Sequence, residues 1–165
     1  MKKILISYVI YIYILITLVL LSLQSEYQTL VTYLKEKVEF NKYAAQLLYD
    51  NNYYAPSVHC AYYSCFQFLK YLIKEKLNIS YQQQSSEISN QRLHTHVYVK
   101  DKILTQVSNI EPDTNKFRDI RTKLIDLQLL RIKSDYENVL IDENSSRKAL
   151  QYSEELKKYF KEKIV

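Results

Sequence analysis

Apolar residues recur along most of this chain at intervals of three and four, the spacing of a helix with one buried face. Two such runs follow each other between residues 26 and 50. The first consists of Tyr27, Leu30, Val31, Leu34 and Val38. The second is shifted in phase and consists of Phe40, Tyr43, Ala44, Leu47 and Leu48. The phase shift predicts either one helix with a break near residues 38–40 or two helices in series.

The next pattern begins at Pro56, which suits the first turn of a helix because the missing N–H costs little there. Asn78 is expected to end this helix. Its inward positions are Val58, Tyr62, Cys65, Leu69, Leu72 and Ile73. Its outward positions are Lys70, Lys74 and Glu75. The pattern is typical of a long helix packed in a core.

The second half of the chain continues the helical pattern after a polar interruption. Residues 78–92 are rich in Gln and Ser and predict a connection that is either mobile or functional. A short helix is expected near 97–107, and Pro112-Asp113-Thr114 marks the start of another. The inward stripe of that helix is Phe117, Ile120, Leu124, Leu127 and Arg131. The last helix begins near 144–146 and places inward Ala149, Tyr152, Leu156, Phe160 and Ile164.

No segment of the chain beyond residue 25 alternates with the period of a β-strand, and glycine, which tight hairpins favour, is absent from all 165 residues. We therefore expect an all-α fold, a four-to-five-helix up-and-down bundle over residues 26–165.

A hydrophobic segment precedes this domain within residues 1–25. Residues 4–23 carry no charge, and fourteen of these twenty are Ile, Leu or Val. A helix of twenty residues spans about 30 Å, the thickness of a bilayer core. The segment predicts a single N-terminal membrane anchor on a cytoplasmic domain, with its orientation open. The alternative is a start site assigned too far upstream, so that these residues are no part of the natural protein.

The composition excludes few of the possible functions of this protein. The net charge of +5 is spread along the helices rather than gathered in a stripe, so it permits contact with RNA without arguing for it. Cys60 and Cys65, the only cysteines, lie roughly 140° apart on one helix, which does not suit a disulfide. No Cys/His spacing resembles a metal site, and we expect no metal and no cofactor.

Arg131 stands out because a charged residue occupies an otherwise apolar stripe. Asp135, four residues on, shares its helix face and can pair with it, and Tyr136 is adjacent. The pair is open to two interpretations. It can be a buried clamp that fixes helix register. It can also be a phosphate site, because the planar guanidinium binds oxyanions through two N–H groups.

The order of these features resembles the HEPN superfamily, in particular its prokaryotic branch with an AYYA-like helix. The matching pieces are Ala61-Tyr62-Tyr63-Ser64, then His94 or His96, and then 131–136, RIKSDY. They extend over about residues 40–163. The resemblance implies a helical bundle that is often a homodimer, is encoded beside a minimal nucleotidyltransferase, and takes part in toxin–antitoxin or phage-defence modules.

Many members of that superfamily cleave RNA without metal through an R-x(4–6)-H motif, but no histidine follows Arg131 at that distance. Tyr136 is a poor general base at neutral pH because the phenol titrates near 10. The leading expectation is therefore a non-catalytic HEPN-like binding partner. The first alternative is an RNase that uses Arg131 and Asp135 with Tyr136, His94 or His96. The second is a membrane-tethered helical scaffold. Tyr62, Tyr63 and His59 are expected to form a binding or dimer interface.

Overall fold

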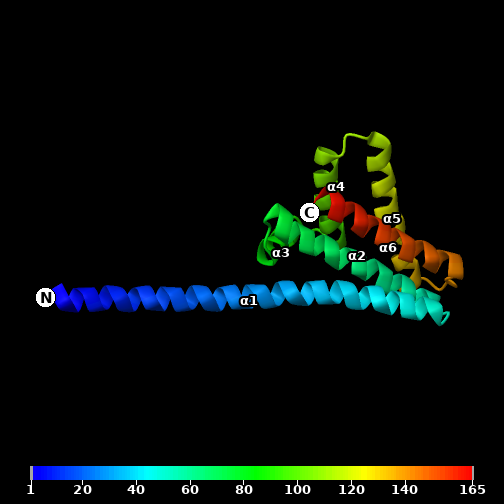
Figure 1. Ribbon diagram of the computed structural model, residues 1–165. Coiled ribbons are helices and arrows are strands. Elements are labelled where there is room, and N and C mark those ends of the chain that lie inside the picture. The colour runs from blue at the N-terminus through cyan, green and yellow to red at the C-terminus, as the bar shows by residue number, and fades with distance from the viewer. Residues whose placement is uncertain (1, 165) are drawn as a thin grey trace. The chain divides into compact units, whose positions relative to one another are not determined.

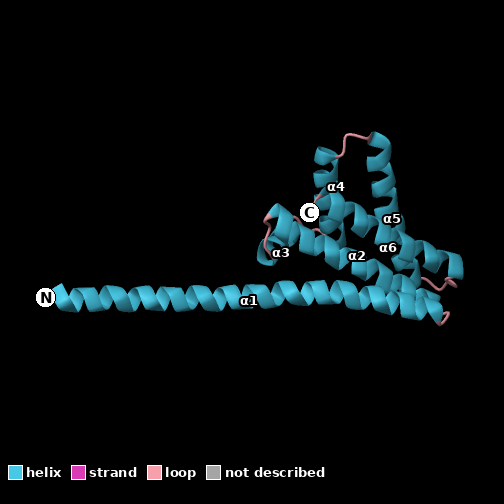
Figure 2. Cartoon of the chain, in the orientation of Figure 1, coloured by secondary structure: helices cyan, strands magenta, loops and turns pink. Residues whose placement is uncertain are grey.

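The computed structural model describes residues 2–164, which form six helices and no strand (Figures 1 and 2). The helices are α1 (Lys2–Asp50), α2 (Tyr54–Leu77), α3 (Tyr81–Asn90), α4 (Thr95–Ile110), α5 (Thr114–Tyr136) and α6 (Glu143–Lys163). The side chains of residues 2–11, 13 and 23–32 lie outside the description. The all-α class is confirmed for the described residues.

The chain divides into two compact units, residues 1–34 and residues 35–165. The first unit is the helical segment that opens α1. Among the residues that the structure describes, none of the helices combines the length and the apolar content needed to cross a bilayer. Half of the side chains of the anchor predicted at 4–23 lie outside the described set, and the anchor gains no support from this finding.

The second unit holds the hydrophobic core, in which α2 is central and packs against α4, α5 and α6. All six inward positions predicted for α2 are buried. The stripes of α5 and α6 are also confirmed, with Ile120, Leu124 and Leu127 buried on one and Ala149, Leu156 and Phe160 on the other. Both cysteines are free thiols, and Cys65 is buried in the core as expected.

Two sequence expectations for α1 are wrong. The helix is continuous through residues 38–40, so there is no break. Moreover, the second apolar run faces solvent: Phe40, Tyr43 and Leu47 are 67 %, 68 % and 65 % exposed. Among the described side chains of this helix, Val38 and Ala45 enter the core, and both are small enough to let the α1 backbone lie close to α2.

The segment 78–92, expected as an irregular connection, contains α3. Its start is fixed by a capping box: the Ser80 hydroxyl accepts from the Gln83 N–H, and the Gln83 side chain accepts from the Ser80 N–H. Lys74, expected to point outward, is instead buried. Its ammonium lies over the Tyr81 ring of α3, 5.1 Å from the centroid.

The helix ends are built without glycine. Asn52 follows α1 with φ 63°, Asn78 caps α2 with φ 54°, and Arg92 follows α3 with φ 51°. Asparagine tolerates this left-handed conformation better than most residues with a side chain. Asp113 accepts hydrogen bonds from the first turn of α5, at the helix start that the sequence predicted. Asp142 does the same for α6, which begins at Glu143, one residue before the start expected near 144–146.

A buried polar seam joins α1, α2 and α6. The hydroxyls of Ser57 and Ser64 on α2 donate to the carbonyls of Ala45 and Val38 on α1, at 2.8 and 3.0 Å. From α6, the Lys157 ammonium donates to the Ser64 hydroxyl at 2.7 Å and pairs with Glu154. Every polar atom in this set has a partner, so the seam can lie in a dry interface.

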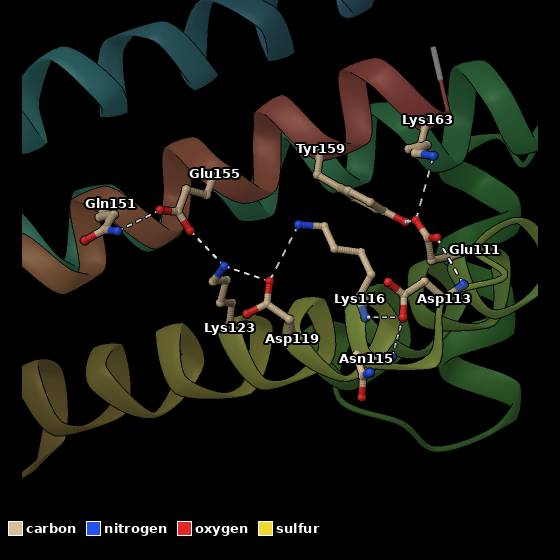
Figure 3. A network of polar contacts seen from close by, with 10 residues as sticks. All are labelled: Glu111, Asp113, Asn115, Lys116, Asp119, Lys123, Gln151, Glu155, Tyr159 and Lys163. Carbon is tan, nitrogen blue, oxygen red and sulfur yellow. Dashed lines mark hydrogen bonds and ion pairs between the residues drawn. The ribbon is translucent and has the colours of Figure 1, made fainter.

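A second polar network ties the α4–α5 corner to α6 (Figure 3). Lys123 of α5 bridges Asp119 at 2.8 Å and Glu155 of α6 at 2.9 Å. The Tyr159 hydroxyl donates to Glu111 at 2.9 Å, and its pKa is raised by burial and by that carboxylate. Tyr159, Glu111 and Lys123 are shielded from water, and each has a partner within the network. The network therefore links α6 to α5 and to the end of α4.

Candidate functional site

The site is formed by facing turns of α2 and α5, with one residue from α4. From α2 come His59, Tyr62 and Tyr63, and from α5 come Arg131, Asp135 and Tyr136. His96 approaches from the first turn of α4. Seven of the eight residues singled out in the sequence therefore lie in one cluster. His94 is the exception: it caps α4 at an exposed position, without a side-chain hydrogen bond to the helix.

Arg131 is the centre of the cluster and is only 9 % exposed. Its Nη2 donates to the Tyr63 hydroxyl at 2.7 Å and to the Tyr136 hydroxyl at 3.0 Å. Its Nε lies 2.8 Å from Asp135 Oδ2, a close ion pair whose atoms are not aligned as a hydrogen bond. The predicted Arg131–Asp135 pair is thus present. The two tyrosine hydroxyls accept hydrogen bonds from the Arg131 guanidinium and so help to stabilise its positive charge.

His59 is held by Asp135 across the α2–α5 interface. Its Nδ1 lies 3.0 Å from both carboxylate oxygens of Asp135, and the Ser134 hydroxyl donates to Oδ1 at 3.1 Å. The ring also packs on Tyr63, with centroids 4.6 Å apart. Nδ1 faces the carboxylate, so Nε2, on the opposite side of the ring, points away from it. The His59 side chain is partly exposed. An Asp–His pair of this kind fixes the tautomer and orientation of an imidazole.

The second histidine lies on the other side of the tyrosine pair. Tyr62 shares a 2.8 Å hydrogen bond with His96 Nδ1, and the His96 ring lies 4.4 Å from the ring of Phe66. Burial and the neighbouring charge of Arg131 lower the pKa of His96, so its neutral form is favoured. Burial also raises the pKa of Tyr62, which stays a protonated phenol.

The electrostatics of the site are those of a compensated cation. Burial acts to lower the pKa of Arg131, and the adjacent Tyr63, Asp135 and Tyr136 outweigh that effect and raise it. The pKa of Cys60 is raised by burial and by the Asp135 charge, so this thiol is a weak nucleophile. Among the described residues no group of three His, Cys, Asp or Glu side chains converges as a metal site. The groups present are those of acid–base chemistry on an anionic substrate.

The sequence identified the members of the cluster but missed the role of one. His59 was assigned to an interface, whereas the structure pairs it with Asp135, 76 positions away. A sequence signal existed, because His59 and Tyr63 share a face at i, i+4 on α2. Ser134 and Phe66 were also missed, and nothing in their spacing distinguishes them from ordinary helix residues.

No family model matches the chain, and searches of curated proteins and of solved structures return no significant match.

Proposed function

We propose that this protein is a HEPN-like domain that cleaves RNA without a metal ion, using His59 as the general base. The observation that carries the proposal is the contact of His59 Nδ1 with both oxygens of Asp135. The sequence favoured a non-catalytic role because no histidine follows Arg131 at the usual distance. His59 supplies an imidazole to the same site from α2, which removes that objection.

The chemistry follows from the geometry of the cluster. His59 Nε2 takes the proton from a ribose 2′-hydroxyl, whose oxygen attacks the adjacent phosphorus. The bond to the 5′-oxygen breaks, and that oxygen takes a proton from solvent, which leaves a 2′,3′-cyclic phosphate. Tyr63 and Tyr136 accept hydrogen bonds from the Arg131 cation, so their own O–H groups are stronger donors. They would stabilise the charge that builds on the phosphate oxygens.

The test uses the full chain in mild detergent with a single-stranded RNA oligonucleotide and EDTA. We expect cleavage to 2′,3′-cyclic phosphate ends, and a loss of at least about a hundredfold in His59→Gln. His94→Gln is the matched control, because His94 is exposed and lies outside the cluster. If the wild type leaves RNA intact, or if His59→Gln cleaves as fast as His94→Gln, the catalytic proposal is wrong.

The second candidate is the non-catalytic partner of a toxin–antitoxin or phage-defence module. The observation that favours it is the closure of the cluster around Arg131, whose guanidinium already contacts Asp135, Tyr63 and Tyr136. A closed cluster of this kind can shape a surface without turning over a substrate. Inactivity towards RNA, combined with co-purification of a nucleotidyltransferase encoded beside this protein, would support it.

The composition of residues 4–23 supports a further proposal, that the domain is tethered to the membrane by an N-terminal helix. The tethered full chain should resist extraction by alkaline carbonate, whereas a chain starting at residue 26 should be released. Release of both chains would contradict the tether and favour a start site downstream of the hydrophobic segment.

A further inference from the structure

Tyr136, the last residue of α5, is 71 % exposed and yet is held in place. Its hydroxyl accepts the hydrogen bond from Arg131 Nη2 at 3.0 Å. The central carbon of the same guanidinium lies over the ring, 4.9 Å from its centroid. Exposed side chains exchange between rotamers rapidly when nothing restrains them. The two contacts with Arg131 therefore give the protein an exposed aromatic ring in a fixed orientation.

The other two tyrosines beside Arg131 do not share this property. Tyr62 is buried in the core. Tyr63 is half-buried, and its ring packs on the ring of His59 with centroids 4.6 Å apart. Among the described side chains, Arg131 alone lies over the Tyr136 ring. One face of this ring therefore carries a cation, and the opposite face is open to solvent.

The position of the ring indicates what its open face contacts. Tyr136 belongs to the site built around His59, Asp135 and Arg131, which we call the His59 cluster. Asp135, which holds His59, immediately precedes Tyr136 in the chain. Proteins bind single-stranded nucleic acid by stacking its bases on exposed aromatic rings beside positive charge. The open face of Tyr136 has the shape and the surroundings that a nucleobase requires.

We propose that the ring of Tyr136 is the stacking platform for one unpaired nucleobase of the RNA, next to the bond that is cleaved. This inference rests on the proposed function, because a nucleotide whose base lies on Tyr136 brings its ribose and phosphate to the His59 cluster. A base within a duplex is already stacked on both faces, and removing it from the stack costs free energy. Every base has a π face, so the platform requires a single strand without selecting its sequence.

The ring and the hydroxyl of Tyr136 have separate roles. The hydroxyl contributes to the chemistry by stabilising charge on the phosphate oxygens, whereas stacking needs only the ring. Tyr136→Phe removes the hydroxyl and keeps the ring, and Tyr136→Leu removes both. The difference in RNA binding between these two variants therefore isolates the ring. Neither change should unfold the domain, because Tyr136 is exposed at the end of α5.

The experiment measures binding of a fluorescent single-stranded RNA oligonucleotide by anisotropy, with the full chain in mild detergent and EDTA. All variants carry His59→Gln, so that cleavage does not interfere. Adding Tyr136→Leu should weaken binding about tenfold, and adding Tyr136→Phe less than about threefold. The matched control is Tyr43→Leu, which changes a tyrosine of α1 that is 68 % exposed and should leave binding unchanged. The same RNA annealed to its complement should bind all these proteins equally.

The outcomes separate the platform from the cleavage reaction. Equal affinities of the Tyr136→Leu and Tyr136→Phe chains for the single strand overturn the platform, even if the wild type cleaves RNA. A loss of duplex binding as large as that of single-strand binding overturns it as well, and so does an absence of any binding to the single strand. A wild type that leaves RNA intact, while Tyr136→Leu binds more weakly than Tyr136→Phe, contradicts cleavage and supports the platform.

A further variant keeps the test decisive if Tyr136→Leu loses helical content by circular dichroism. Tyr136→Trp retains a stacking ring and enlarges it, so it should bind the single strand at least as tightly as Tyr136→Phe. Weaker binding by Tyr136→Trp than by Tyr136→Phe, with the fold intact, overturns the platform.

Discussion

At the scale of single residues, the stability of the cluster depends on the Arg131–Asp135 ion pair. The two side chains are only 11 % and 16 % exposed. Arg131→Ala leaves a carboxylate that is largely shielded from water and keeps only neutral or partly exposed partners, the Ser134 hydroxyl and His59. We expect a loss of about 3 kcal/mol in the free energy of unfolding. Arg131→Leu combined with Asp135→Leu should recover much of that loss, because both charges leave together.

Urea denaturation of these variants measures the effect. The matched control is Arg147→Ala, which removes the exposed contacts of Arg147 with Glu143 and Tyr49 and should leave the free energy of unfolding nearly unchanged. Equal losses in Arg131→Ala and Arg147→Ala would show that water screens the cluster far more than its burial indicates.

His96 gives the stability a defined pH dependence. Burial, followed by the charge of Arg131, lowers the pKa of His96 in the folded state below its value in the unfolded chain, about 6.5. The unfolded state therefore binds the proton more readily. The contribution of His96 is present above about pH 6.5 and is lost as the pH falls through the lowered folded value.

Thermal melting between pH 7.5 and 5 should thus show a fall in Tm that His96→Asn reduces, since asparagine can keep a hydrogen bond to Tyr62. His94 affects the pKa of His96 less than burial, Arg131 and Lys70 do, so His94→Asn should change the slope less than His96→Asn does. A slope that is the same in all three proteins would assign the pH dependence to other groups.

Part of the site could be predicted from the sequence because it depends on helix periodicity. Arg131 falls on the apolar stripe of α5, and Asp135 follows one turn later, so their pairing needed no tertiary information. The contact of His59 with Asp135 depends on how α2 and α5 face each other. Helix spacing does not determine that relation, and for this reason the sequence assigned His59 to an interface and did not predict its contact with Asp135.

At the scale of the helix, α3 shows why a polar segment can be misread. Residues 81–90 lack an apolar period, since the segment buries little more than Gln84, and so hydrophobic patterning predicted a connection. Ser80 and Gln83 nevertheless carry the serine-to-glutamine spacing of a capping box. The sequence signal for α3 was therefore its capping residues, not a hydrophobic period.

Ser80→Ala should therefore destabilise α3 by about 1 kcal/mol. Amide hydrogen exchange over residues 81–90 should accelerate several-fold, while exchange in α2 remains unchanged. Ser85→Ala, at an exposed position in the middle of α3, is the control and should have little effect. Equal exchange in Ser80→Ala and the wild type would mean that packing, not the cap, holds this helix.

The carboxyl-terminal part of α1, residues 35–50, was predicted wrongly for a different reason. Phe40, Tyr43 and Leu47 have the composition of a buried stripe, and the shift in phase was attributed to a break in the helix. The structure keeps the helix straight and gives it two apolar sides, one narrow and made of small residues. Patterning alone does not distinguish an apolar side that faces the core from one that is exposed.

At the scale of the whole molecule, the described core residues run from Val38 to Phe160 and all belong to the compact unit of residues 35–165. A truncated chain of residues 26–165 should be soluble and strongly helical by circular dichroism. A chain of residues 54–165 should fail, because it leaves the buried hydroxyls of Ser57 and Ser64 without their acceptors on α1. Aggregation of 26–165, or a folded 54–165, would contradict this division of the chain.

Because the chain has no glycine, residues with side chains occupy its left-handed backbone positions, and this lowers the stability of the fold. Arg92 adopts a left-handed backbone with φ 51°, where a long side chain costs about 1 kcal/mol relative to glycine. Arg92 lies in the turn between α3 and α4, outside the His59 cluster. Arg92→Gly is accordingly a route to a more heat-resistant protein in which every group of the cluster is retained, a useful starting point for variants that would otherwise be too unstable to study.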